Sequence, residues 1–140
     1  MNVLFVCTGN TCRSPMAEGY LLSKNLKDVN IISRGIAADG SPAAENAKKA
    51  MSEAGIDING HISVSLSAED VKNADRIICF SPSHKALICE AFGGSDKICV
   101  LSGGITDPYG GDEDTYRRCR DEIFSAIDRL LEEGFFKDFT

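Results

Sequence analysis

The sequence predicts an α/β fold in which a parallel β-sheet carries helices on both faces. Short apolar runs with strand-like patterning alternate along the chain with longer segments of helix-like periodicity, which is the rhythm of βαβ units. The length of 140 residues allows one hydrophobic core but not two ordinary ones. We therefore expect one α/β domain over residues 1–140.

Four apolar runs are predicted to form the strands. They are short and built mainly from valine, isoleucine, leucine, cysteine and phenylalanine. The predicted strands cover residues 2–6, 30–33, 76–80 and 97–101.

The segments between and after these runs are predicted to be helical. Ser41 and Pro42 are typical of a helix start, and Gly55 is typical of a helix end. Gly93 and Gly94 end a later helix in the same way. The predicted helices cover residues 15–26, 42–54, 67–71, 83–92 and 112–133.

The junction between the first strand and the first helix carries the most informative chemistry. At such a junction the backbone N–H groups converge and the helix N-terminus adds partial positive charge, which makes an anion site. A guanidinium such as that of Arg13 holds two oxygens of a phosphate-like group, and the same field favours a thiolate over a thiol. The junction therefore predicts a loop that binds a phosphoryl group and attacks it through Cys7. Its residues are Cys7, Thr8, Gly9, Asn10, Thr11, Cys12, Arg13 and Ser14.

The alternative is that Cys7 is one more buried thiol at the end of a core strand, where free cysteine is common. A structural cysteine needs neither Gly9 and Asn10, which tolerate unusual backbone angles, nor an arginine six residues on. The complete segment therefore favours a catalytic loop.

Cys-x5-Arg-Ser directly after the first strand resembles the signature of the cysteine-dependent phosphatases. Its place near the start of a short chain resembles the low-molecular-weight protein tyrosine phosphatase family, and Asp107-Pro108 occupies the place of that family's catalytic Asp-Pro. The resemblance covers essentially the whole chain. It implies a four-stranded parallel sheet in the order 2-1-3-4, phosphorylated protein substrates and no cofactor.

The same resemblance implies the roles of individual residues. Cys7 is the nucleophile, Arg13 the phosphate clamp and Asp107 the general acid, while Asn10 and Ser14 shape the loop and stabilise the thiolate. The residues that bind phosphate or shape the loop are then Thr8, Gly9, Asn10, Thr11, Cys12 and Ser14.

Asp107 has a simpler interpretation, because Asp-Pro often just begins a turn. Expulsion of the leaving group is nevertheless far easier when an acid donates a proton, and the chain offers no better-placed acid. Pro108 also keeps the residue before it extended, which suits a carboxyl group held over a pocket. We therefore expect Asp107 to act as acid and then, once ionised, as base for hydrolysis of the phosphocysteine.

Thr11 bears on the choice of substrate. Many family members that act on phosphotyrosine have isoleucine here, whereas threonine resembles the protein arginine phosphatase branch, and a hydroxyl can orient a guanidinium or a water molecule. Tyr109 is expected to form the aromatic wall of the pocket, and Asp39 either attracts a guanidinium or is simply solvated. Phosphoarginine is therefore favoured over phosphotyrosine. Arg34 stands where the family commonly has alanine, and the sequence gives it no purpose.

Cys12, the second cysteine of the loop, has two interpretations. It either fills space beneath the loop or, as in family members that share it, forms a reversible disulfide with Cys7. The second interpretation implies a thiol reductant as partner.

Two alternatives to a phosphatase have to be weighed. Thioredoxin-coupled arsenate reductases share this fold and nearly the same loop, but they commonly have glutamine in place of Pro15 and need two relay cysteines after the third strand. Cys79 and Cys89 fall instead within a predicted strand and a predicted helix. A phosphate-binding regulatory module without turnover is disfavoured because nucleophile, clamp and acid are all present.

Composition excludes several other classes. The formal net charge of −6 disfavours nucleic acid as a partner. No apolar run approaches the roughly 18 residues that span a bilayer, and residues 3–6 are too short for a signal peptide, so no membrane association and a cytoplasmic location are expected. The six cysteines are expected to be reduced, and neither they nor His61 and His84 show metal-ligand spacing, so we expect no metal. A monomer is expected.

Overall fold

Parallel strands form the central sheet of the computed structural model, which describes residues 1–137. Within these residues the sheet has four strands in the order β2-β1-β3-β4, and each neighbouring pair is parallel. The α/β class and the strand order implied by the resemblance are therefore confirmed. Residues 138–140, the end of the expected 1–140 domain, lie outside the described residues. The strands are β1 (Asn2–Cys7), β2 (Asn30–Gly35), β3 (Arg76–Cys79) and β4 (Ile98–Val100).

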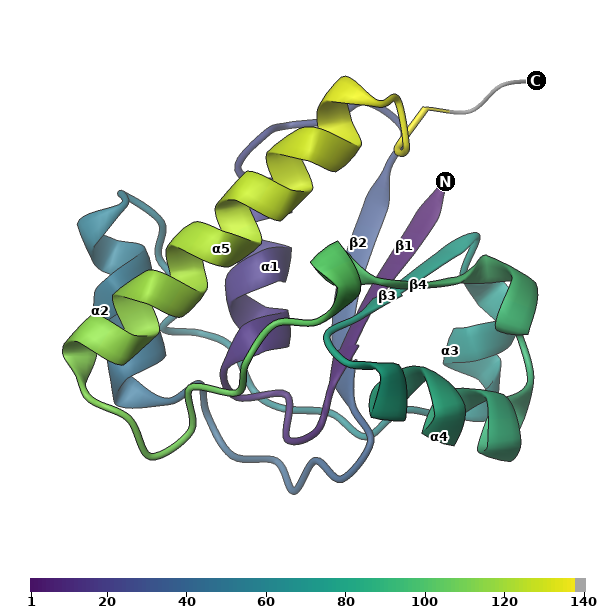
Figure 1. Ribbon diagram of the computed structural model, residues 1–140, viewed down its shortest axis with the longest axis horizontal. Coiled ribbons are helices and arrows are strands. Elements are labelled where there is room, and N and C mark those ends of the chain that lie inside the picture. Colours follow the sequence, from purple (N-terminus) through teal and green to yellow (C-terminus); the bar gives the residue numbers. More distant parts are fainter. Residues whose placement is uncertain (138–140) are drawn as a thin grey trace.

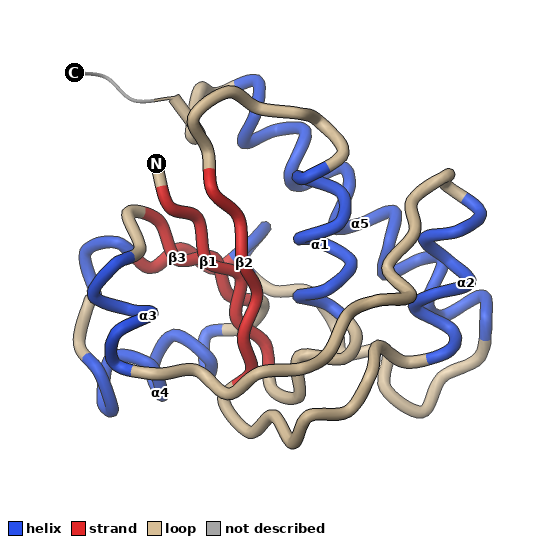
Figure 2. Tube along the Cα trace, turned by 180° about the vertical axis from the view of Figure 1, so that it is seen from behind, coloured by secondary structure: helices blue, strands red, loops and turns tan. Residues whose placement is uncertain are grey.

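Helices cover both faces of this sheet, as Figure 1 shows from one side and Figure 2 from behind. Val3 and Phe5 of β1 belong to the core on one face, and Leu4 and Val6 to the core on the other. All four side chains are buried, as expected of a central strand in a parallel sheet. One face carries α1 (Arg13–Leu22), α2 (Glu45–Glu53) and α5 (Glu113–Glu132), and the other carries α3 (Ala68–Asn73) and α4 (Pro82–Phe92).

The first helix is shorter at its C-terminal end than the predicted range 15–26. It begins at Arg13, where the loop ends, and it ends at Leu22. The backbone N–H and the hydroxyl of Ser23 both donate to the carbonyl of Tyr20, and Asn25 has a φ of +52°, which a helix cannot continue.

The second helix and the last strand are also shorter than predicted. Pro42 pairs with Ile62 in an antiparallel bridge, so α2 begins only at Glu45 rather than at residue 42. Lys97 and Leu101, predicted to be in a strand, lie in the 3₁₀ turns η1 (Ser95–Lys97) and η2 (Leu101–Gly103). The late start of α2 arises from pairing between residues distant in the chain, which sequence periodicity does not reveal.

The remaining helices begin close to their predicted starts because polar side chains cap them. In each case the residue before the helix accepts a hydrogen bond from a backbone N–H of the first turn: Ser67 for α3, Ser81 for α4 and Asp112 for α5. Gly93, with a φ of +76°, ends α4 as predicted. Within residues 1–137, none of the helices combines the length and apolar character that crossing a membrane requires.

The structure shows an ion pair for Arg34, a residue whose purpose the sequence does not indicate. Its Nε lies 3.1 Å from the Oδ2 of Asp70, which also closes the capping box of α3 with Ser67. Both side chains are partly buried, and the pair links β2 to the start of α3.

Candidate active site

The carboxyl end of β1 opens into a cavity of about 230 Å³. Residues 8–12 form the loop between Cys7, the last residue of β1, and Arg13, the first residue of α1. Because β1 lies between β2 and β3, this end of the strand is where ligands bind in open parallel sheets. The structure brings most of the predicted site residues together here. The cavity is lined by Cys7, Thr8, Gly9, Thr11, Cys12, Arg13, Asp107 and Tyr109.

The loop turns its carbonyl groups toward the surrounding protein. Backbone N–H groups from the segments after β2, and one histidine ring, donate to these carbonyls. Within residues 1–137 the N–H groups of residues 8–12 make no such bonds, so they are available to an anion. The carbonyl of Cys7 accepts from the N–H of Ile36 (2.9 Å), and that of Thr8 from the N–H of Ala37 (2.8 Å). The carbonyl of Asn10 accepts from the ring of His61 (2.7 Å), and that of Thr11 from the N–H of Ala44 (2.9 Å).

Asn10 organises the loop from beneath. It is fully buried and has a φ of +58°, a conformation that asparagine tolerates better than most residues. Its Nδ2 donates to the hydroxyls of Ser14 (2.8 Å) and Ser33 (3.0 Å), and its Oδ1 accepts from the N–H of Val64 (3.0 Å). Since Ser14 Oγ accepts from Asn10, its own proton is free for the Sγ of Cys7, 2.9 Å away. A buried hydroxyl is thus placed to stabilise a thiolate at Cys7.

His61 supports the same loop. Its Nε2 donates to the carbonyl of Asn10, and its Nδ1 lies 3.7 Å from the carboxylate of Glu18. Glu18 also accepts from the hydroxyl of Ser33 (3.0 Å), and burial raises the pKa of Glu18. His61 therefore supports the loop and does not line the cavity.

Arg13 is the buried cation of the cavity, with 5% of its surface exposed. Its Nη1 donates to the carbonyl of Ile105 (2.9 Å), its Nη2 lies 3.7 Å from the carboxylate of Asp107, and its guanidinium lies over the ring of Phe80. Its Nε is buried and has no hydrogen-bond partner within residues 1–137. An unsatisfied buried donor is costly, so this atom indicates an oxyanion as the natural occupant of the cavity.

Asp107 stands at the mouth of the cavity with about half of its side chain exposed. Its Oδ1 accepts from the N–H of Tyr109 (3.1 Å), and its Oδ2 faces Arg13. One oxygen is therefore fixed while the other is free to give or take a proton. Tyr109 is 79% exposed and is one of the residues that line the cavity.

Cys12 lines the cavity, and its thiol contacts the hydroxyl of a tyrosine in α5. Its Sγ lies 3.3 Å from the hydroxyl of Tyr116 in α5 and 3.6 Å from the hydroxyl of Thr11. Burial raises the pKa of Cys12, and burial also raises the pKa of Tyr116. Cys12 is therefore held as a neutral thiol.

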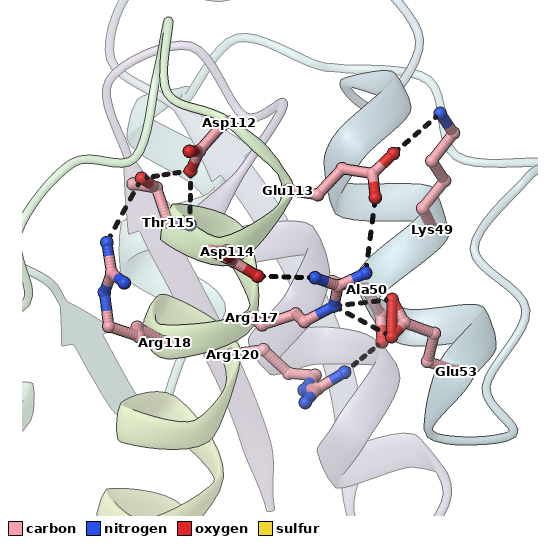
Figure 3. A network of polar contacts seen from close by, with 10 residues as sticks. All are labelled: Lys49, Ala50, Glu53, Asp112, Glu113, Asp114, Thr115, Arg117, Arg118 and Arg120. Atoms are coloured by element: carbon pink, nitrogen blue, oxygen red, sulfur yellow. Dashed lines mark hydrogen bonds and ion pairs between the residues drawn. The ribbon is translucent and has the colours of Figure 1, made fainter.

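A network of ion pairs ties the N-terminal end of α5, which carries Tyr116, to α2 (Figure 3). Arg117 of α5 donates to both carboxylate oxygens of Glu53 at 3.0 and 2.9 Å and also pairs with Glu113. Glu113 in turn pairs with Lys49 of α2 at 3.2 Å. These groups are solvent-exposed, so each pair alone is weak, but together they link the N-terminal end of α5 to α2.

Not every predicted site residue reaches the cavity wall. Asn10 and Ser14 lie beneath the loop. Asp39 is exposed and does not line the cavity; its carboxylate accepts from the hydroxyl and the N–H of Ser41, and these bonds lower the pKa of Asp39. Asp39 therefore caps a turn, as in the solvated alternative.

Two residues that sequence reasoning missed support the loop. Gly35 lies opposite Cys7 in the sheet, and a Cβ on it would meet the Thr8 carbonyl oxygen at 2.8 Å. His84 in α4 has its Nε2 2.9 Å from the hydroxyl of Thr8, a residue 76 positions earlier. A glycine at the end of a strand is a weak signal of close approach, and no sequence signal pairs His84 with Thr8.

The cysteines that an arsenate reductase needs as a relay are placed unfavourably. Cys79 is buried at the end of β3, where burial raises its pKa to about 11, and Cys89 lies within α4. Neither of these thiols therefore lies in the segment between β3 and α4.

Comparison with known proteins places this site in context. The profile of the family described as low molecular weight phosphotyrosine protein phosphatase matches residues 2–137. A protein-arginine-phosphatase of Geobacillus stearothermophilus is 42% identical over 94% of each chain. The crystal structure of a low molecular weight protein tyrosine phosphatase from T. tengcongensis is 41% identical, has a TM-score of 0.89 and matches over 95% of this chain and 99% of the other. An arginine phosphatase, YwlE, solved as a mutant with a phosphorylated active-site serine, is 36% identical, has a TM-score of 0.93 and matches over 99% of this chain and 98% of the other.

Proposed function

This chain belongs to the low molecular weight phosphotyrosine protein phosphatase family, and we propose that it hydrolyses phosphoarginine in proteins in preference to phosphotyrosine. It is a cysteine-dependent phosphatase that works through a phosphocysteine intermediate. The observation that carries the proposed catalytic assignment is the cavity in which Cys7, the unsatisfied Nε of Arg13 and the carboxyl group of Asp107 meet.

In the proposed first step, the thiolate of Cys7 attacks phosphorus while Arg13 and the loop N–H groups bind the nonbridging oxygens. The new S–P bond forms as the P–N bond of phosphoarginine, or the P–O bond of phosphotyrosine, breaks. The electron pair of the broken bond goes to the leaving nitrogen or oxygen, which takes the proton of Asp107. Ser14 stabilises the thiolate before the attack.

In the proposed second step, water attacks the phosphorus of the phosphocysteine. Asp107, now ionised, takes a proton from this water, the S–P bond breaks, and its electron pair returns to Cys7 as thiolate. Inorganic phosphate leaves, and Asp107 is protonated again for the next cycle. The Oδ2 of Asp107, which lies 3.7 Å from Nη2 of Arg13 at the cavity mouth, suits both transfers.

Sequence identity does not decide between phosphoarginine and phosphotyrosine as substrate, because an arginine phosphatase is 42% identical to this chain and a tyrosine phosphatase is 41% identical. Thr11 supports the preference for phosphoarginine because it lines the cavity beside Cys7 and carries a hydroxyl. A hydroxyl accepts a hydrogen bond from a guanidinium N–H, which an apolar side chain cannot do. Tyr109 offers a ring on which the planar guanidinium of the substrate can stack.

The test is steady-state kinetics on matched peptides that carry phosphoarginine or phosphotyrosine, with the wild type and Thr11→Ile. We expect the wild type to prefer phosphoarginine and Thr11→Ile to lose about tenfold in kcat/KM on phosphoarginine alone, the effect of one hydrogen bond. A wild-type preference for phosphotyrosine that Thr11→Ile leaves unchanged contradicts the substrate assignment. Activity that survives Cys7→Ser contradicts the catalytic assignment.

We also propose that Cys7 and Cys12 form a reversible disulfide. Peroxide oxidises the thiolate of Cys7 to sulfenic acid, the thiol of Cys12 attacks that sulfur, water leaves, and a thiol reductant later restores both thiols by exchange. Their shared place in the cavity wall supports this pairing.

The remaining expectations belong to the same proposal. We propose one phosphatase domain over residues 1–140 that acts in the cytoplasm as a monomer on phosphorylated proteins. The family profile over residues 2–137 supports the single domain.

A further inference from the structure

His84 is a buried histidine that the proposed reaction does not use. It lies in the first turn of α4, on the side of the sheet opposite α1, with 5% of its surface exposed. Its Nδ1 accepts from the backbone N–H of Phe80 at 3.4 Å. An amide N–H can only donate, so Nδ1 carries a lone pair and the ring proton sits on Nε2.

The Nε2–H of His84 points at the side chain of Thr8. The two atoms, Nε2 and Oγ1, are 2.9 Å apart. Since this ring nitrogen must donate, the hydroxyl oxygen of Thr8 accepts, and the hydroxyl proton is left for another acceptor. Within residues 1–137, no other group bonds to this hydroxyl. Thr8 lines the cavity beside Cys7 and Arg13.

The neutral ring is the state that fits these contacts. Burial and, to a lesser extent, the charge of Arg13 lower the pKa of His84 to about 4, with Asp107 acting in the opposite sense. A second ring proton would sit on Nδ1 and face the N–H of Phe80. His84 therefore keeps one fixed tautomer at neutral pH.

The same arrangement occurs on the other side of the loop. There the buried amide of Asn10 donates to Ser14, which leaves the Ser14 proton for the nucleophile. In both cases a buried N–H group donates to the hydroxyl oxygen, so the hydroxyl proton is left to form a hydrogen bond with a different acceptor.

We propose that His84 is a positioning residue that fixes the Thr8 hydroxyl as a hydrogen-bond donor to an oxygen of the phosphoryl group in the cavity. The inference rests on the proposed function, because it assigns a further donor to the same phosphate site. Thr8 then adds a side-chain bond to those from the loop backbone and from Arg13. His84 touches neither the phosphoryl group nor the nucleophile.

The test uses substitutions of His84 that each keep one of the two hydrogen bonds of the ring and remove the other. In His84→Asn, the side-chain oxygen takes roughly the place of Nδ1 and accepts from Phe80, but nothing reaches Thr8. In His84→Gln, the side-chain nitrogen takes roughly the place of Nε2 and donates to Thr8, but the acceptor for Phe80 is lost. Thr8→Val removes the hydroxyl at nearly constant volume. The readouts are the inhibition constant of inorganic phosphate, and kcat and KM on an aryl phosphate.

We expect Thr8→Val and His84→Asn each to weaken phosphate inhibition and lower kcat/KM by about five- to tenfold, the effect of one hydrogen bond. The double variant should lose little more than either single variant, because both remove the same bond. His84→Gln should stay within about twofold of the wild type. A purely structural role predicts the reverse order, with Gln worse than Asn.

Additive losses in the double variant, or a phosphate inhibition constant unchanged by Thr8→Val, would overturn the proposal. If His84→Asn does not fold, Thr8→Val and His84→Gln still decide it. Failure of the proposed function looks different, because it shows as a wild-type preference for phosphotyrosine or as activity that survives Cys7→Ser, and neither result depends on the order of the Thr8 and His84 variants.

Discussion

Replacing Gly35 by alanine should damage the phosphate-binding loop without changing any residue that lines the cavity. The added Cβ would lie 2.8 Å from the carbonyl oxygen of Thr8, 2.9 Å from the Cβ of Asn10 and 3.0 Å from the Cβ of Ala38. Carbon–oxygen and carbon–carbon contacts are normally about 3.3 Å and 3.5–4.0 Å. The loop or β2 must therefore move apart by about 0.5–1 Å, the difference between these contact distances.

The size of the effect follows from this displacement. Overpacking of a rigid site costs about 1–3 kcal/mol, and a shift of about 1 Å at a reacting centre costs up to about 100-fold in rate. We expect Gly35→Ala to lower the free energy of unfolding by about 1–3 kcal/mol and kcat/KM by about 10- to 100-fold. Urea unfolding and steady-state kinetics at a temperature where the variant stays folded measure the two effects separately.

Gly60→Ala is the matched control. A Cβ on Gly60 meets no atom within 4 Å, and its φ lies outside the left-handed region. Its unfolding free energy should change by no more than about 0.5 kcal/mol, and its kcat/KM should not change. If Gly35→Ala behaves like Gly60→Ala, the close approach of β2 to the loop does not hold the loop in place.

Three further predictions concern the acid, the second cysteine and Arg34. Asp107→Asn should lower kcat by about 10²–10⁴-fold while vanadate still binds, since the clamp is intact; an unchanged kcat removes Asp107 from the mechanism. Cys12→Ser should recover less activity than the wild type when a thiol is added after peroxide, and equal recovery argues against the disulfide. Arg34→Ala should lower the free energy of unfolding by up to about 1 kcal/mol through loss of the partly screened pair with Asp70, and leave kcat unchanged; a fall in kcat would place Arg34 in the catalytic site.

The parts of the site that the sequence predicts are those formed by consecutive residues of the chain. The run from Cys7 to Arg13 predicts an anion-binding loop because it is a strand end, a turn and a helix start in immediate succession. The family motif predicts Asp107 as the acid, and the carboxylate of Asp107 lies 3.7 Å from Nη2 of Arg13 at the cavity.

The parts that sequence does not predict depend on how distant segments meet. His84 reaches Thr8 only because β1 and β3 are neighbours and α4 follows β3. Gly35 matters only because the register places it opposite Cys7. Asp39 is the opposite case, because its hydrogen-bond partner Ser41 lies only two residues away, and Asp39 does not line the cavity.

Helix ends can be predicted where a local interaction sets them, and not where a contact between distant residues does. Ser81 and Asp112 mark their helix starts correctly because a cap is a local interaction. The start of α2 was placed too early because Pro42 pairs with Ile62, twenty residues away in the chain. Propensity alone cannot foresee such a bridge.

The most direct test of the central claim is the mass of the intact protein, quenched in acid during turnover of a phosphoarginine peptide. A fraction of the protein should carry one added phosphoryl group, peptide mapping should place it on Cys7, and Asp107→Asn should change how much of it accumulates. Turnover of the peptide with no phosphate on Cys7 at any time of quenching would contradict the phosphocysteine mechanism.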